Sequence, residues 1–174
     1  LYTAYVASQS NRLHLWSVPI AGATPTAPIT QLSSAAMVGG GSVTTFVISP
    51  DSARVVFRAS VANIATPELF SVALAPAIVP PTPVTLSGSI AAGGGVDSSG
   101  TLVGFTSSPI QISSDSATVL FVADRVSSGV HDLWSVPITG ATVSAPLTNL
   151  SQILVNGGNL TAYEIAADGV RVVF

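Results

Sequence analysis

Short apolar runs separated by turn-forming residues recur along the whole chain, and one such pattern occurs three times. Two apolar runs flank a turn that contains an aspartate in FVISPDSARVVF (46–57), IQISSDSATVLF (110–121) and YEIAADGVRVVF (163–174). An Asp followed by Ser or Gly suits a short hairpin, because the carboxylate accepts backbone NH hydrogen bonds and Gly permits positive φ. The pattern predicts three β-hairpins. We interpret their acidic residues as turn formers, not as catalytic or metal-binding groups: Asp51, Asp115 and Asp168.

Two further segments alternate with the hairpins at near-constant distances. A strand with one aromatic residue is predicted at LHLWSVPI (13–20), PELFSVAL (67–74) and HDLWSVPI (131–138). A short strand that opens on proline follows each of them, in APITQLS from Ala27, TPVTLS from Thr82 and APLTNLS from Ala145. Four short strands per unit predict an all-β fold, a β-propeller segment of about three four-stranded antiparallel blades.

We expect residues 1–174 to form a single segment of this kind. The repeat units fall at about 1–45 (a partial blade), 46–109, 110–162 and 163–174, the last being the first hairpin of a further blade. Propellers have about four to eight blades. The segment is therefore expected to be a partial ring or part of a larger propeller, and its further blades come either from the same longer chain or from other copies.

The order of these markers is similar to the WD40-like repeat of TolB-type β-propellers, often called PD40. The best copy is ISSDSATVLFVADRVSSGVHDLWSVPI (112–138), in which Ala123-Asp124-Arg125, Gly129 and Asp132 also match the family's pattern. Other units depart from it: only Ser49-Pro50-Asp51 keeps the proline, and Ser8-Gln9 and Ser60-Val61 stand where Asp124-Arg125 would be. The resemblance implies a propeller that acts as a non-catalytic binding or scaffold module, in the periplasm or outside the cell.

Composition narrows the possible partners. Hydrophobic residues make up 48 % of the chain and charged residues 7 %, against a usual charged share of about 25 %. Strands covered on both faces explain such a balance. The net charge is −3, there is no lysine and no basic patch, so no nucleic acid partner is expected. No uninterrupted apolar run reaches about 18 residues, which argues against a membrane span. The absence of cysteine excludes disulfides, cysteine-bound zinc and a thiol nucleophile.

Residues suited to catalysis are few. His14 and His131 both begin the aromatic strand, Glu68 and Glu164 lie in different units, and no G-x-S-x-G motif is present. No catalytic residue, metal ligand or cofactor is therefore predicted. Trp16, Phe70 and Trp134 could form a platform for sugars, but one aromatic per unit is better explained as packing between neighbouring blades.

A protein partner is expected at one loop face. Strand alternation places the long glycine-rich connection 88–109 on the same face as the loop before each aromatic strand. The glycine run Gly93-Gly94-Gly95 precedes no helix, so we interpret it as linker and not as a phosphate loop. The candidate partner-binding residues on this face are Asp124, Arg125 and His131.

Two other functions remain open at this point. The chain could be the propeller domain of a prolyl-oligopeptidase-like peptidase, or a repeating structural subunit of an extracellular assembly. Asn149-Leu150-Ser151 and Asn159-Leu160-Thr161 also match the N-glycosylation pattern, which leaves modification at either asparagine open.

Overall fold

The computed structural model describes residues 2–24 (except 10–11), 29–33, 41–60, 66–74, 81–96, 109–152 and 160–174, with the backbone alone for 2–9. These residues contain strands and no helix, which confirms the predicted all-β class. The strands are β1 Tyr2–Gln9, β2 Arg12–Pro19, β3 Thr30–Gln31, β4 Val43–Ile48, β5 Arg54–Ser60, β6 Pro67–Ala73, β7 Val84–Thr85, β8 Ile110–Ile112, β9 Thr118–Ala123, β10 Asp132–Pro137, β11 Thr148–Asn149, β12 Glu164–Ile165 and β13 Val172–Val173.

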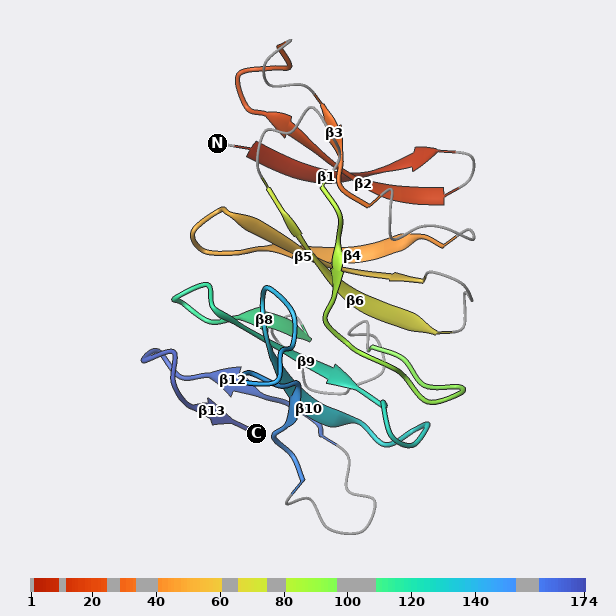
Figure 1. Cartoon of the computed structure of the whole chain (residues 1–174), viewed down its shortest axis with the longest axis vertical. Helices are drawn as coiled ribbons and strands as arrows, with labels where there is room; N and C mark the ends of the chain where they lie inside the picture. Colours follow the sequence, from red (N-terminus) through yellow and green to blue (C-terminus); the bar gives the residue numbers. More distant parts are fainter. Residues whose placement is uncertain are drawn as a thin grey trace.

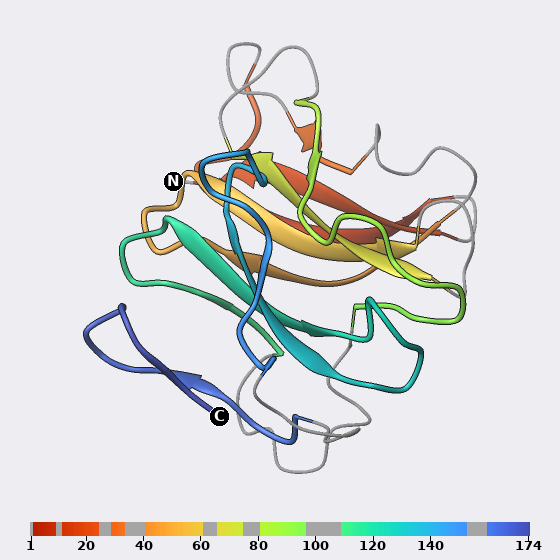
Figure 2. The ribbon, with the colours of Figure 1, turned by 60° about the horizontal axis from the view of Figure 1, so that its bottom comes forward.

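The strands form four antiparallel sheets in which neighbours in sequence are neighbours in space. The first sheet has the order β1-β2-β3, the second β4-β5-β6-β7, the third β8-β9-β10-β11, and β12 pairs with β13 in the terminal hairpin. The sheets follow one another along the molecule from the N-terminus to the C-terminus (Figure 1) and stack as layers (Figure 2). The unit boundary predicted between residues 45 and 46 falls inside β4, so the second sheet begins at Val43.

The same register is repeated in the first three sheets. The aromatic residue of each central strand lies opposite an aromatic residue of the preceding strand, in the pairs Tyr5 with Trp16, Phe57 with Phe70 and Phe121 with Trp134. The rings of Phe57 and Phe70 stack with their centroids 5.5 Å apart. Tyr5 therefore takes the position in the first sheet that Phe57 takes in the second.

Successive sheets pack face to face through three hydrophobic clusters. Alternate residues of β5 point to opposite neighbours: Phe57 lies in the cluster shared with the first sheet, whereas Val56 lies in the cluster shared with the third. In the same way Phe121 of β9 faces the second sheet, and Leu120 faces the terminal hairpin. Both faces of these strands are buried, which explains why they read as continuous apolar runs.

A buried serine after each short strand extends the pairing of that strand with the aromatic strand by one residue. The Oγ atoms of three serines accept hydrogen bonds from backbone NH groups of three leucines: Leu15 to Ser33 at 3.0 Å, Leu69 to Ser87 at 3.1 Å, and Leu133 to Ser151 at 3.0 Å. All three serines are buried. A buried NH without a partner is costly. The serine after each short strand therefore stabilises the sheet by accepting a hydrogen bond from the leucine NH of the aromatic strand.

Two of the three acidic turns have the same hydrogen bonding, and the third shares the hydrogen bond from a backbone NH to the aspartate. In the second sheet, the Oγ of Ser49 donates to Asp51, and Asp51 Oδ1 accepts from the NH of Ala53 at 2.9 Å. Ser113 and Asp115 repeat this arrangement. In the terminal hairpin alanine replaces the serine, and Asp168 instead forms an ion pair of 2.7 Å with Arg171. The predicted role of the aspartates as turn formers is confirmed.

The turns lie along one edge of the stack (Figure 1). The backbone NH of Asp51 donates to the Oγ of Ser116 in the next turn at 3.0 Å. A Cβ atom on Gly169, whose φ is +70°, would lie 2.6 Å from the Oγ of Ser114. Neighbouring turns are therefore in direct contact, which aligns the three hairpins along one edge.

The turn hydrogen bonds predict acid sensitivity. The hydroxyl of Ser113 and then the NH of Ala117 lower the pKa of Asp115 from its ordinary 3.8. A depressed folded-state pKa adds stability that is present above the unfolded-state value and is lost as the pH falls through the folded value. We expect the Asp115→Asn variant to lose less of its melting temperature than the unmodified protein when the pH is lowered below about 4.

NMR titration of the Asp115 carboxyl tests the cause. Its pKa should lie below 3.8 in the unmodified chain and should rise toward that value in Ser113→Ala, which removes the largest contribution. A carboxyl that titrates at or above 3.8 in the unmodified chain would contradict the described turn.

Candidate functional site

The candidate site is the connection 124–131 between β9 and β10, together with the segment 88–96 that follows the second sheet. Backbone contacts hold the segment 88–96 against this connection and the end of β9. The NH of Ala91 donates to the carbonyl of Arg125 at 2.9 Å, the NH of Asp124 donates to the carbonyl of Gly95 at 3.2 Å, and Val96 forms an isolated bridge with Ala123. Part of the glycine-rich connection 88–109 is thus fixed on the third sheet, while residues 97–108 lie outside the described residues.

Asp124 holds the two segments together through its carboxylate. Its Oδ1 accepts a short hydrogen bond from the NH of Gly95, and its Oδ2 accepts one of 2.9 Å from the NH of Gly129. The residue is buried. Hydrogen bonds to an ionised group are among the stronger ones in proteins, so Asp124 has a structural role in shaping this edge.

Arg125 packs on the aromatic residue of its own sheet. Its guanidinium carbon lies 4.3 Å from the centroid of the Trp134 ring, and its Nη2 donates to the carbonyl of Ser89 at 3.2 Å. Burial lowers the pKa of Arg125 from its ordinary value. A cation over an indole face adds about 0.5–2 kcal/mol. The side chain therefore links the surface of the connection to the hydrophobic cluster beneath it.

His131 ends the same connection, and its carbonyl accepts a hydrogen bond of 3.1 Å from the NH of Leu160. The next residue, Asp132, accepts a hydrogen bond of 2.9 Å from the Oγ of Ser151. The structure thus brings Asp124 and Arg125 together with the segment 88–96, and places His131 at the start of β10. The predicted role of the three residues in partner binding stays a prediction.

The glycine run is needed for close packing, which the interpretation as a plain linker missed. A Cβ atom on Gly94 would overlap the carbonyl oxygen of Asp124, and one on Gly95 would lie 2.7 Å from the Cδ of Pro67. Residues 97–108, which follow the run, lie outside the described residues, so the expectation that it is not a phosphate loop stays a prediction. The sequence offered one sign of this packing: the longest connection contains adjacent glycines, and the unit that follows it contains an Asp-Arg pair.

Two of the three aromatic residues proposed as packing groups are buried between sheets. Phe70 lies in the cluster between the first and second sheets, and Trp134 in the cluster between the second and third. The Nε1 of Trp134 donates to the carbonyl of Ala123 at 3.2 Å. Trp16 is half-buried, and its indole NH has no partner among the described residues. Phe70 and Trp134 therefore do not form a surface platform for sugars, because both side chains are buried.

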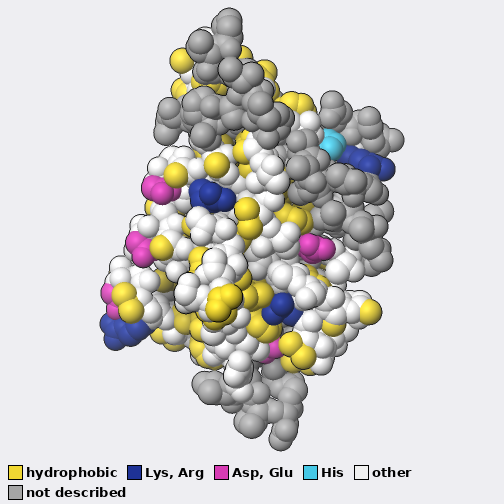
Figure 3. Space-filling model, viewed as in Figure 1, with side chains coloured by type: hydrophobic (Ala, Val, Ile, Leu, Met, Phe, Trp, Pro, Cys, Tyr) yellow, Lys and Arg dark blue, Asp and Glu magenta, His cyan; other side chains and the backbone are white. Residues whose placement is uncertain are grey.

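Charged groups are sparse on the face shown in Figure 3, and acidic side chains follow the edge where the three turns lie. Within the described ranges, no three His, Asp or Glu side chains are grouped closely enough to hold a metal ion. The same ranges contain no helix with the length and apolar character that crossing a membrane requires. Asn149 uses its side-chain oxygen to accept hydrogen bonds from Ser151, and Asn159 lies outside the described residues.

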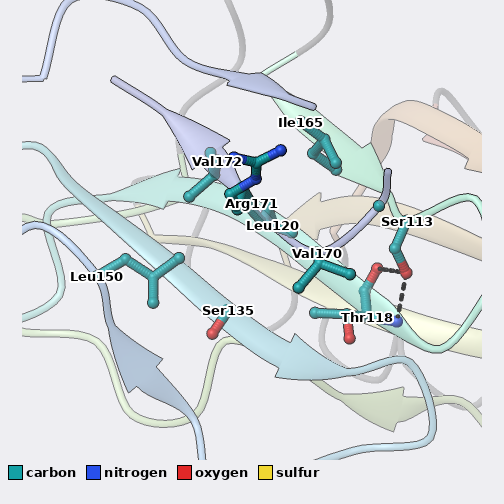
Figure 4. Close-up of a pocket in the computed structure, with 10 residues that line it drawn as sticks. Ser113, Thr118, Leu120, Ser135, Leu150, Ile165, Val170, Arg171 and Val172 are labelled. Carbon is teal, nitrogen blue, oxygen red and sulfur yellow. Dashed lines mark hydrogen bonds between the residues drawn. The ribbon is translucent and has the colours of Figure 1, made fainter. Parts of the chain in front are cut away.

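A second candidate site is a pocket of about 240 Å³ between the third sheet and the terminal hairpin, which the sequence did not predict. Apolar side chains from both elements project into it, and Ser113 and Thr118 hydrogen-bond each other at one end (Figure 4). The lining residues are Ser113, Thr118, Leu120, Ser135, Leu150, Ile165, Gly169, Val170, Arg171 and Val172. Four of its lining residues carry polar side chains: Ser113, Thr118, Ser135 and Arg171.

A scan against protein-family models finds no family that matches the chain, and a search of curated proteins finds no match. Function is therefore inferred from the fold and from the geometry of these two sites.

Proposed function

We propose that the chain is a section of a TolB-like β-propeller and acts as a non-catalytic binding or scaffold module in the periplasm or outside the cell. The observation that supports this most strongly is the repeated stack. The first three sheets share their antiparallel order and the Leu-to-Ser hydrogen bond, and the second, third and terminal sheets share the aspartate turn. Radial repetition of four-stranded sheets is the building principle of a propeller.

The edge formed by 124–131 and 88–96 is the proposed binding surface. Loops held on a rigid scaffold are the usual place for binding residues, and Asp124 and Arg125 fix the shape of this pair of segments. Val126 projects from the connection with 70 % of its surface exposed. The low charge of the chain and its net charge of −3 favour a protein partner over nucleic acid.

Site-specific photo-crosslinking tests this proposal. A photoreactive amino acid at position 126 is expected to give a discrete adduct with a periplasmic or secreted protein, and excess unlabelled chain should compete it away. Position 143 is the matched control, because Val143 is fully exposed on the connection between β10 and β11, at the opposite end of β10. No adduct at 126, or the same adducts at both positions, would contradict the proposed surface.

A further inference from the structure

Arg125 has a positive charge that no acidic side chain neutralises within the described residues. Its Nη2 donates to the carbonyl of Ser89, and its Nε is buried without a hydrogen-bond partner in that part of the chain. Arg171 shows the contrast, because its guanidinium forms an ion pair of 2.7 Å with Asp168. A buried donor without an acceptor is costly. The Arg125 guanidinium therefore has hydrogen-bonding capacity that its surroundings do not use.

The two carboxylates closest to Arg125 in sequence are both engaged elsewhere. Asp124 is buried and accepts hydrogen bonds from two backbone NH groups of the neighbouring segments. Asp132 accepts a hydrogen bond from the Oγ of Ser151. Both acidic groups are thus fixed by the third sheet and its connections, so a carboxylate that pairs with Arg125 comes from outside the described residues.

The surroundings of the guanidinium leave one side of it open. A Cβ atom on Gly88 would lie 3.0 Å from the Nη2 of Arg125 and 3.4 Å from the Cδ2 of Leu147, so the missing side chain leaves a space between these two groups. Leu147 packs on the same cluster as Trp134, over which the guanidinium lies. A charge-assisted hydrogen bond is stronger in such apolar surroundings than in water.

This position does not depend on where the stack ends. Trp134 belongs to the cluster between the second and third sheets, whereas the opposite face of the third sheet packs on the terminal hairpin. Further units stacked beyond that hairpin would therefore leave Arg125 uncovered. The side chain is partly exposed, and Val126 beside it projects from the same connection.

We propose that Arg125 binds a carboxylate side chain of a protein partner, an aspartate or glutamate flanked by apolar residues. The fork of a guanidinium matches the two oxygens of a carboxylate, and arginine over an aromatic ring is a frequent centre of protein interfaces. A doubly charged phosphate is less suited, because Asp124 adjoins the single cation and the chain has a net charge of −3. The inference rests on the proposed binding surface and names the chemistry of its partner.

Titration of the full chain with an acetylated and amidated Val-Glu-Val tripeptide tests the site. The Nε–H signal of Arg125 in heteronuclear NMR is the readout, because burial slows its exchange with water. At constant ionic strength we expect a saturable shift of this signal. The same tripeptide with glutamine in place of glutamate should bind at least about tenfold more weakly. Absence of a shift, or equal binding of the two tripeptides, would overturn the proposal.

Chain variants identify the residue that binds the carboxylate. Arg125→Gln should weaken binding of the glutamate tripeptide at least about tenfold, and Arg125→Lys, which keeps the charge without the fork, should fall between the two. Arg171→Gln removes another arginine and should leave binding unchanged. Unchanged binding in Arg125→Gln would contradict the proposal. Binding that appears only in Asp97→Asn would overturn it in favour of the chain's own carboxylate as the occupant.

Crosslinking at position 126 of the unmodified chain tests the proposed function separately. A discrete adduct that persists in Arg125→Gln, together with no binding of the glutamate tripeptide, would overturn the carboxylate contact and leave the binding surface in place. Loss of the adduct in Arg125→Gln, with the amide of Ala91 keeping its chemical shift, would support the contact, because the segment 88–96 would still be held on the third sheet.

Discussion

Replacing Trp134 with alanine is expected to lower the free energy of unfolding by about 3–5 kcal/mol. Trp134 is 6 % exposed and packs between the second and third sheets. Its removal leaves a cavity in that interface, frees the carbonyl of Ala123 from the indole NH and removes the surface on which Arg125 lies. The loss therefore combines the cavity with two specific contacts, which places it among the largest single-residue effects in this chain.

Urea denaturation followed by circular dichroism measures this effect. Trp134→Phe should lose clearly less stability than Trp134→Ala, because it keeps most of the apolar volume. Val143→Ala should be nearly neutral, since Val143 is fully exposed. A near-neutral Trp134→Ala would show that this residue does not lie between two sheets, and would make a surface role for the aromatic residues worth testing again.

Gly94→Ala is expected to lower the free energy of unfolding by about 1–3 kcal/mol. The new Cβ atom would overlap the backbone carbonyl of Asp124, which cannot rotate away as a flexible side chain could. Both backbones are also held in place, because the NH of Gly94 donates to the carbonyl of Ala91 at 2.9 Å and Asp124 donates to Gly95. We expect the segment 88–96 to move off the third sheet.

Hydrogen exchange locates this second effect. The amide of Ala91 should lose protection in Gly94→Ala, while the amides of β9 and β10 should keep it. Ala92→Ser is the matched control, because Ala92 is an exposed neighbour in the same turn, and it should change stability by less than about 0.5 kcal/mol. Unchanged protection of Ala91 in Gly94→Ala would contradict the close approach of Gly94 to Asp124.

The secondary structure was predictable because each kind of turn and strand recurs, and each is marked by a characteristic residue. The turn aspartates, the aromatic strands and the short strands after proline recur three times, and their hydrophobic positions alternate as two buried faces require. The serine after each short strand also recurs, in Ser33, Ser87 and Ser151, yet its hydrogen bond to a leucine NH was not predicted. That bond links residues that only the folded sheet brings together.

The sequence predicted where the candidate site lies but not which contacts its residues make. Asp124 and Arg125 do lie at one edge with part of the glycine-rich connection, as strand alternation indicated. Their roles depend on contacts with Gly95, Ser89 and Trp134 that no local pattern encodes. The pocket beside Leu150 was missed because it arises from the way two sheets meet at the end of the stack.

The stacking of consecutive repeat units as neighbouring sheets is tested most directly by nuclear Overhauser contacts across one interface. The ring protons of Phe121 and Trp134 belong to the third sheet, and the methyl groups of Val56, Leu69 and Leu86 belong to the second, yet all lie in one buried cluster. We predict strong contacts between these rings and these methyl groups. Rings that show contacts only within the third sheet would contradict the stack, and with it the proposed propeller.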